Sequence, residues 1–170
     1  MDVILLAKDG LMVPAEIPEM LPTNIVQTLT NIGLPVDYIR EKAREMGLQL
    51  MVLFGSYATG DFDDDSDLDL AFDPGPDNPV TEEQVRNALQ DRTGVYVHPL
   101  PLPNTSPAVR AEVALTGICL FESKPGTWEK YCIRALSEWE KLRPAYERQI
   151  KDEWDKDTIP HDEIEKYLKS

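Results

Sequence analysis

Residues 54–70 read FGSYATGDFDDDSDLDL, in which a Gly55-Ser56 turn is followed, after ten intervening residues, by Asp67-Leu68-Asp69. A Gly-Ser turn after a strand lets backbone N–H groups and the Ser hydroxyl approach phosphate oxygens without an intervening side chain. Two aspartates separated by one residue on a strand place both carboxylates on one face of the sheet. Either half alone is typical of a common turn or a solvated strand edge, but together they indicate a functional site.

The residue types indicate the chemistry of this site. Hard carboxylate oxygens suit Mg²⁺, which binds one or two carboxylates together with substrate phosphates. A pair of such ions can hold the attacking and leaving oxygens of a displacement in line. We therefore predict that Asp67 and Asp69 are metal ligands and catalytic residues, and that Gly55 and Ser56 bind phosphates. The reaction class is phosphoryl or nucleotidyl transfer.

The flanking sequence predicts alternating helices and strands. Apolar residues recur at helical spacing from Val36 to Met46, and Gly47 then ends the helix. Thr81 and Gln84 form a capping box, and Ser106-Pro107 has the chemistry of a second helix start. The expected elements are helices over 36–46, 81–92 and 107–116, and strands over 48–54, 67–72, 95–100 and 118–121. The predicted fold class is α/β (α+β), a small mixed sheet flanked by helices.

Both ends of the chain are predicted to extend this domain, which we place at residues 35–125. Residues 1–34 read as an appendage, with a hairpin of residues 3–7 and 11–13 followed by irregular structure broken by prolines. Residues 126–170 read as a helical extension kinked at Pro144. Its stripe of apolar residues is more often a face that packs on the protein's own sheet, and it is also a candidate for part of a partner interface: Trp128, Cys132, Ala135, Trp139, Leu142, Tyr146, Ile150 and Trp154.

The composition restricts the partners. The chain carries 17 Lys and Arg against 31 Asp and Glu, a net charge of −14. Such a surface repels a phosphate backbone, so no direct DNA or RNA binding is expected. It favours a basic protein partner, although acidity that only maintains solubility is an equal alternative. Cys119 and Cys132 form no C-x-x-C pair, and no segment reaches the length of a membrane span, so a cytoplasmic location is expected.

The sequence resembles the minimal nucleotidyltransferases (MNT) of the DNA polymerase beta-like superfamily over about residues 36–121. The resemblance rests on Gly55-Ser56-Tyr57-Ala58, on Ser66-Asp67-Leu68-Asp69-Leu70, and on the closing Arg110-Ala111-Glu112 helix with Gly117 and Leu120-Phe121. It implies a sheet of the polymerase beta nucleotidyltransferase type. It also implies Mg²⁺-dependent transfer of a nucleoside monophosphate from a triphosphate, with ATP as donor. Gly55 and Ser56 would then hold the phosphates, and Asp67 and Asp69 the metal.

The same resemblance implies a partner. Small prokaryotic members of this family often resemble antitoxins that are paired with a HEPN-domain ribonuclease toxin. Such antitoxins can neutralise the toxin by adenylylating one of its tyrosines. A partner of this kind would be basic, which agrees with the acidic composition. A second alternative is a small-molecule nucleotidyltransferase of the aminoglycoside-modifying kind, for which the chain is short.

Two positions depart from the family pattern. Active members carry a third carboxylate on the next strand, but this strand reads Val95-Tyr96-Val97-His98-Pro99. His98 is a candidate base or weak Mg²⁺ ligand, and a polar strand end is the simpler interpretation. Thr59 stands where the family commonly has Arg. A catalytically degenerate module that neutralises its partner by binding alone therefore stays open. The aspartates of 61–65 lack the glycine and glutamate of an EF-hand, so a solvated loop is expected there.

Overall fold

A four-stranded mixed sheet forms the centre of the computed structural model, which describes residues 4–6, 12–14 and 21–156, with side chains from 21 to 152. The strands lie in the order β5-β4-β3-β6. β3 pairs antiparallel with both β4 and β6, whereas β4 and β5 run parallel. Their bounds are β3 Leu50–Phe54, β4 Leu68–Asp73, β5 Val97–Pro101 and β6 Ile118–Glu122. This confirms the predicted mixed sheet and its strand segments.

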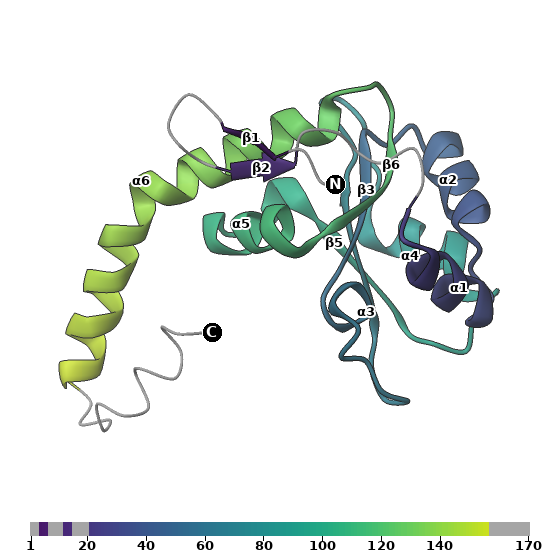
Figure 1. Cartoon of the computed structure of the whole chain (residues 1–170), viewed down its shortest axis with the longest axis horizontal. Coiled ribbons are helices and arrows are strands. Elements are labelled where there is room, and N and C mark those ends of the chain that lie inside the picture. The colour runs from purple at the N-terminus through teal and green to yellow at the C-terminus, as the bar shows by residue number, and fades with distance from the viewer. Residues whose placement is uncertain (1–3, 7–11, 15–20, 157–170) are drawn as a thin grey trace.

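Helices cover both faces of the sheet (Figure 1). One layer holds α1 (Thr23–Asn31), α2 (Val36–Glu45) and α4 (Glu82–Gln90), and the other holds α5 (Pro107–Thr116) and α6 (Thr127–Lys156). The side chains of strand β4 point alternately toward the two layers. Leu68, Leu70 and Phe72 are buried with the first layer, and Ala71 is buried with the second. Because side chains alternate along a strand, Asp69 and Asp73 lie on the α5 and α6 face.

The predicted helix starts are present. Thr81 and Gln84 form the reciprocal capping box at α4, and the Ser106 hydroxyl accepts the Val109 N–H at the start of α5. Two short elements were not predicted, the helix α3 (Ser56–Thr59) and the 3₁₀ turn η1 (Leu102–Asn104). Both follow strands directly, so they shape the connections at the two ends of the sheet.

The N-terminal part differs in one respect from the sequence prediction. β1 (Ile4–Leu6) and β2 (Met12–Pro14) pair antiparallel as expected of a hairpin, whose Lys8-Asp9-Gly10 turn lies outside the described residues. The prediction of irregular structure was wrong for residues 23–31, which form α1. Pro22 does not interrupt a helix but precedes it, and its carbonyl accepts the Ile25 N–H. Ile25 and Leu29 are buried in the core. The boundaries at 34/35 and 125/126 stay predictions.

Helix α6 has two different halves. Its first turns pack on α5 and the sheet, with Trp128, Cys132 and Ala135 buried. Its second half contains Pro144, curves, and extends away from the sheet (Figure 1). Both cysteines are free and buried. No helix among the described residues combines the length and the apolar character that crossing a bilayer requires.

Candidate functional site

The predicted site lies where β3 ends and β4 begins. Gly55 follows β3 with φ 69° and ψ −153°, a conformation available essentially to glycine alone. A Cβ at Gly55 would overlap Asp69 Oδ2 and lie 3.2 Å from its Cγ. The register explains the contact, because Phe54 pairs with Asp69 across the antiparallel ladder. The turn and Asp69, which the sequence predicts to belong to one site, therefore lie against each other.

Asp69 lies on the α5 and α6 side of β4, and Asp67 directly precedes the strand. Leu68 and Leu70 are fully buried on the opposite side. Asp69 is partly buried, with 26% of its side chain exposed, and Asp67 is exposed just before the strand begins. The pair therefore presents one carboxylate held by packing and one that is open to solvent.

His98 lies beside Asp69. Parallel pairing of β4 and β5 puts the two residues opposite each other, and His98 Nδ1 lies 2.9 Å from Asp69 Oδ1. Since a carboxylate only accepts hydrogen bonds, Nδ1 carries the proton of this bond. In the neutral imidazole Nε2 is then an acceptor, on a ring that is 49% exposed. Tyr96, also considered at the sequence level, is exposed, and its ring contacts Arg86. The imidazole of His98 therefore lies on the strand where active family members carry a third carboxylate.

Ser56 begins the short helix α3. The N–H groups of Ala58 and Thr59 donate to the Gly55 carbonyl, so this turn is closed by its own backbone. The first N–H groups of a helix have no acceptor within it, so those at Ser56 and Tyr57 can donate to a ligand. Ser56 is partly exposed. The Thr59 hydroxyl donates to Asp61 Oδ2 at 3.0 Å, so this side chain is tied into the loop and supplies no charge to phosphates.

The acidic loop that joins α3 to β4 is ordered by internal contacts. Asp63 Oδ1 accepts hydrogen bonds from the Asp65 N–H and the Ser66 hydroxyl. The exposed ring of Phe62 stacks on the buried ring of Tyr57, with centroids 4.4 Å apart. Burial, with the charges of the loop aspartates, raises the pKa of Tyr57. These internal contacts agree with the prediction of a solvated loop at residues 61–65, beside the site.

The predicted metal ligands, Asp67 and Asp69, can be compared with the requirements of Mg²⁺. Within the described ranges, no three His, Cys, Asp or Glu side chains form a group able to hold a metal ion. Asp67 and Asp69 supply two hard carboxylates two residues apart, which fits an ion that completes its shell with substrate phosphates and water. His98 supplies nitrogen where a further carboxylate would supply oxygen. The residues therefore fit one nucleotide-borne Mg²⁺ ion.

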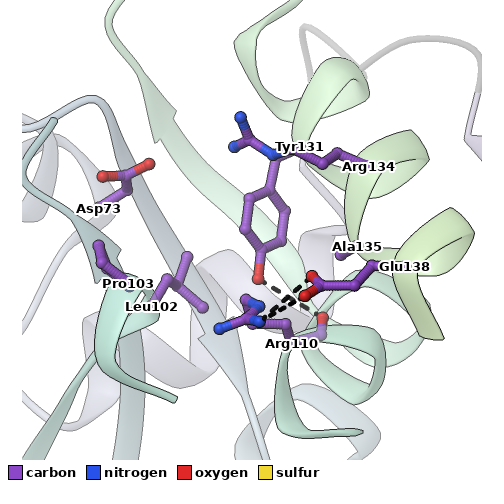
Figure 2. Close-up of a pocket in the computed structure, with 8 residues that line it drawn as sticks. All are labelled: Asp73, Leu102, Pro103, Arg110, Tyr131, Arg134, Ala135 and Glu138. Carbon is purple, nitrogen blue, oxygen red and sulfur yellow. Dashed lines mark hydrogen bonds and ion pairs between the residues drawn. The ribbon is translucent and has the colours of Figure 1, made fainter. Parts of the chain in front are cut away.

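A separate concavity lies on the same face at the other end of β4 (Figure 2). Asp73, which lines it, is four residues from Asp69, about 13 Å along the strand. Arg110 of α5 donates to both carboxylate oxygens of Glu138 of α6, at 3.0 and 3.2 Å. No local sequence pattern connects positions 28 apart, so this pair was not predicted. The ion pair fastens α5 to α6 rather than completing the predicted site.

Residues 38–126 match the family model described as Polymerase beta, Nucleotidyltransferase. A comparison with curated protein sequences gives no match.

Solved structures similar to this chain include antitoxins. A toxin–antitoxin structure with AMP-PNP is 24% identical and has a TM-score of 0.62, over 70% of this chain and 98% of that chain. The MNT antitoxin complexed with tri-AMPylated Shewanella oneidensis HEPN toxin is 21% identical, with a TM-score of 0.56, over 69% and 93%. An MntA–HepT toxin–antitoxin structure is 21% identical, with a TM-score of 0.55, over 69% and 94%. These likenesses show a shared fold.

Proposed function

The chain belongs to the polymerase beta nucleotidyltransferase family, and from this premise we propose that it is the antitoxin of a HEPN/MNT pair. In this proposal it transfers AMP from Mg-ATP to a tyrosine of a HEPN ribonuclease toxin. The observation that carries the proposal is the packing of Gly55 against Asp69, with the exposed Asp67 directly before β4. The fold shared with MNT antitoxins of HEPN toxin pairs supports it, and so does the AMP-PNP in one of those complexes.

The residues of the site divide the chemistry between them. Backbone N–H groups at the start of α3 and the Ser56 hydroxyl would bind triphosphate oxygens. Asp67 and Asp69 would hold Mg²⁺, which when bound neutralises phosphate charge and orients the reacting groups. The tyrosine oxygen forms a bond to the α-phosphorus, the bond from that phosphorus to the bridging oxygen breaks, and pyrophosphate leaves. His98 Nε2 is an acceptor on the same face that can take the phenolic proton.

A second candidate function rests on the same histidine. His98 donates to Asp69 and supplies no carboxylate oxygen, so the metal site is poorer than one with three carboxylates. A module of this kind would bind nucleotide weakly, or would turn it over only slowly. It would neutralise its partner by binding alone. The two candidates share the fold and the partner and differ only in covalent transfer.

An intact-mass experiment separates them. The chain is purified with the HEPN-domain protein that it neutralises, incubated with Mg-ATP, and both chains are weighed. We expect an AMP-sized gain on the partner that is lost in Asp67→Asn and Asp69→Asn variants and in EDTA. Tight, inhibitory binding with no mass gain would instead establish neutralisation by occlusion. Failure to bind or inhibit any such partner would contradict both candidates.

Two further points belong to this proposal. A net charge of −14 agrees with a protein partner rather than with long nucleic acid. Two free, buried cysteines agree with a reducing compartment, so we propose a cytoplasmic location.

A further inference from the structure

The outer edge of β5 is closed to a further strand. β5 is an edge strand of the sheet, and α4 packs beside it (Figure 1). Side chains of α4 occupy the outward backbone groups of Val97, because its N–H donates to Gln90 Oε1 and its carbonyl accepts from Arg86 Nε at 3.1 Å. Pro99 and Pro101 follow at steps of two residues, so their nitrogens face the same way, and they carry no N–H. A partner that approaches this edge therefore meets side chains instead of free backbone groups.

Arg86 reaches from this edge to an exposed aromatic ring. Its guanidinium carbon lies 5.3 Å from the centroid of the Tyr96 ring, and Tyr96 is 51% exposed. Arg86 is partly buried, yet among the described residues none accepts a hydrogen bond from either of its Nη atoms. A guanidinium that is stacked on a ring and keeps its Nη donors free is suited to binding a carboxylate.

Tyr96 and Arg86 lie beside the predicted metal site. The Tyr96 carbonyl accepts the N–H of Leu68 at 2.8 Å, so Tyr96 lies next to the peptide bond that follows Asp67. Two residues further along the chain, His98 contacts Asp69. An exposed ring, a half-exposed imidazole and a guanidinium therefore lie together on the β5 side of the two carboxylates.

The order of the strands assigns this side to the acceptor in the proposed transfer. β4 lies between β5 and β3, and β3 ends at the Gly55-Ser56 turn. The attacking and leaving oxygens of a phosphoryl displacement are roughly in line, on opposite sides of the phosphorus. Pyrophosphate held by the Gly55-Ser56 turn leaves on the β3 side, so the attacking oxygen enters from the β5 side. His98 Nε2, which can take the phenolic proton, belongs to that strand.

We propose that Tyr96 and Arg86 bind the segment of the partner protein that carries the acceptor tyrosine. The exposed Tyr96 ring packs against apolar side chains of that segment, and the free Nη donors of Arg86 bind the carboxylate of an Asp or Glu within it. Residues 61–69 contain six aspartates and no Lys or Arg, so Arg86 supplies the attraction for an acidic group that this loop would otherwise repel. The inference rests on the proposed function, because it concerns the partner of the same site.

Kinetic and binding measurements with the purified HEPN-domain partner test the assignment. Tyr96→Ala and Arg86→Gln should each raise the KM for the partner, and its dissociation constant, by about tenfold or more, because each removes a contact to the bound segment. The dissociation constant for Mg-ATP should not change. Arg92→Gln is the matched control, because Arg92 also stacks on a tyrosine, with its guanidinium carbon 4.3 Å from the ring centroid of Tyr38 on α2. It removes the same charge and should leave all three constants unchanged.

The outcomes distinguish this inference from the proposed transfer. If the wild-type chain binds the partner without transferring AMP, the transfer is contradicted, and the partner dissociation constants of the variants still decide the inference. Constants for Tyr96→Ala and Arg86→Gln that match those of Arg92→Gln would overturn it. A weaker affinity for Mg-ATP in Arg86→Gln, with an unchanged KM for the partner, would also overturn it, because the guanidinium would then bind the nucleotide. Circular dichroism reports whether each variant folds, and Tyr96→Ala decides alone if Arg86→Gln, which loses the contact to Val97, does not fold.

Discussion

Replacing Gly55 by alanine should damage the site through Asp69. The backbone of Gly55 has φ 69° and ψ −153°, and holding a residue with a side chain there costs about 1–3 kcal/mol. The new Cβ would also overlap Asp69 Oδ2. Asp69 must then move, and its hydrogen bond from His98, worth about 1.5–3 kcal/mol when one partner is charged, is lost or weakened. Because the His98 side chain is 49% exposed, water replaces part of this hydrogen bond, and we expect about 2–4 kcal/mol of lost stability in total.

The chain offers a control for the backbone part of this cost. Gly60 also has a positive φ, 87°, but a Cβ there meets nothing within 4 Å. Gly60→Ala should therefore lose about 1–2 kcal/mol, the cost of the left-handed backbone alone. Urea denaturation measures both variants. Calorimetric titration with Mg-ATP should show a loss of at least about tenfold in affinity for Gly55→Ala, equal to about 1.4 kcal/mol, and little change for Gly60→Ala.

A double-mutant cycle identifies the cause. If the overlap with Asp69 is responsible, Gly55→Ala should cost clearly less stability in an Asp69→Ala background than in the wild type. Equal costs in the two backgrounds, or equal Mg-ATP affinities for Gly55→Ala and Gly60→Ala, would refute the contact as the basis of the site.

Three further predictions follow from other contacts. His98→Asp places a third carboxylate beside Asp69, so without metal the variant should have a lower thermal midpoint than the wild type in differential scanning fluorimetry. Added Mg²⁺ should raise the midpoint of the variant more than that of the wild type. An equal Mg²⁺ response would contradict the assignment of Asp69 as a metal ligand. Glu138→Gln should lose about 1 kcal/mol in urea denaturation, because it weakens the partly buried pair with Arg110, and Glu140→Gln on the same helix, which is exposed, should lose much less. Burial raises the pKa of the Cys132 thiol from 9.0 to about 12, so its neutral form is favoured in the folded protein and the unfolded thiol ionises first. The free energy of unfolding should therefore fall between about pH 9 and 12, less steeply in Cys132→Ala, and a slope unchanged by that substitution would exclude the thiol as its source.

The sequence determined the parts of this protein that depend on short-range patterns. The Gly55-Ser56 turn, the spacing of Asp67 and Asp69, and the capping box at Thr81 are each encoded within a few residues. Backbone geometry converts such patterns directly into strands, turns and helix ends. For the same reason the alternation of polar and apolar residues from Asp67 to Phe72 predicted a strand, and β4 buries Leu68 and Leu70 on the side opposite Asp69.

Only the tertiary structure decided which distant residues meet. His98 lies 29 residues after Asp69 and reaches it through the register of the parallel pair β4 and β5. The exclusion of a side chain at Gly55 likewise arises from the antiparallel register of β3 and β4. A shift of one residue in either pairing would turn these side chains to the other face, and no local pattern fixes that register. The sequence therefore named the candidate residues of the site, while the pairing of strands determined that the imidazole of His98 and the backbone of Gly55 lie against the Asp69 carboxylate.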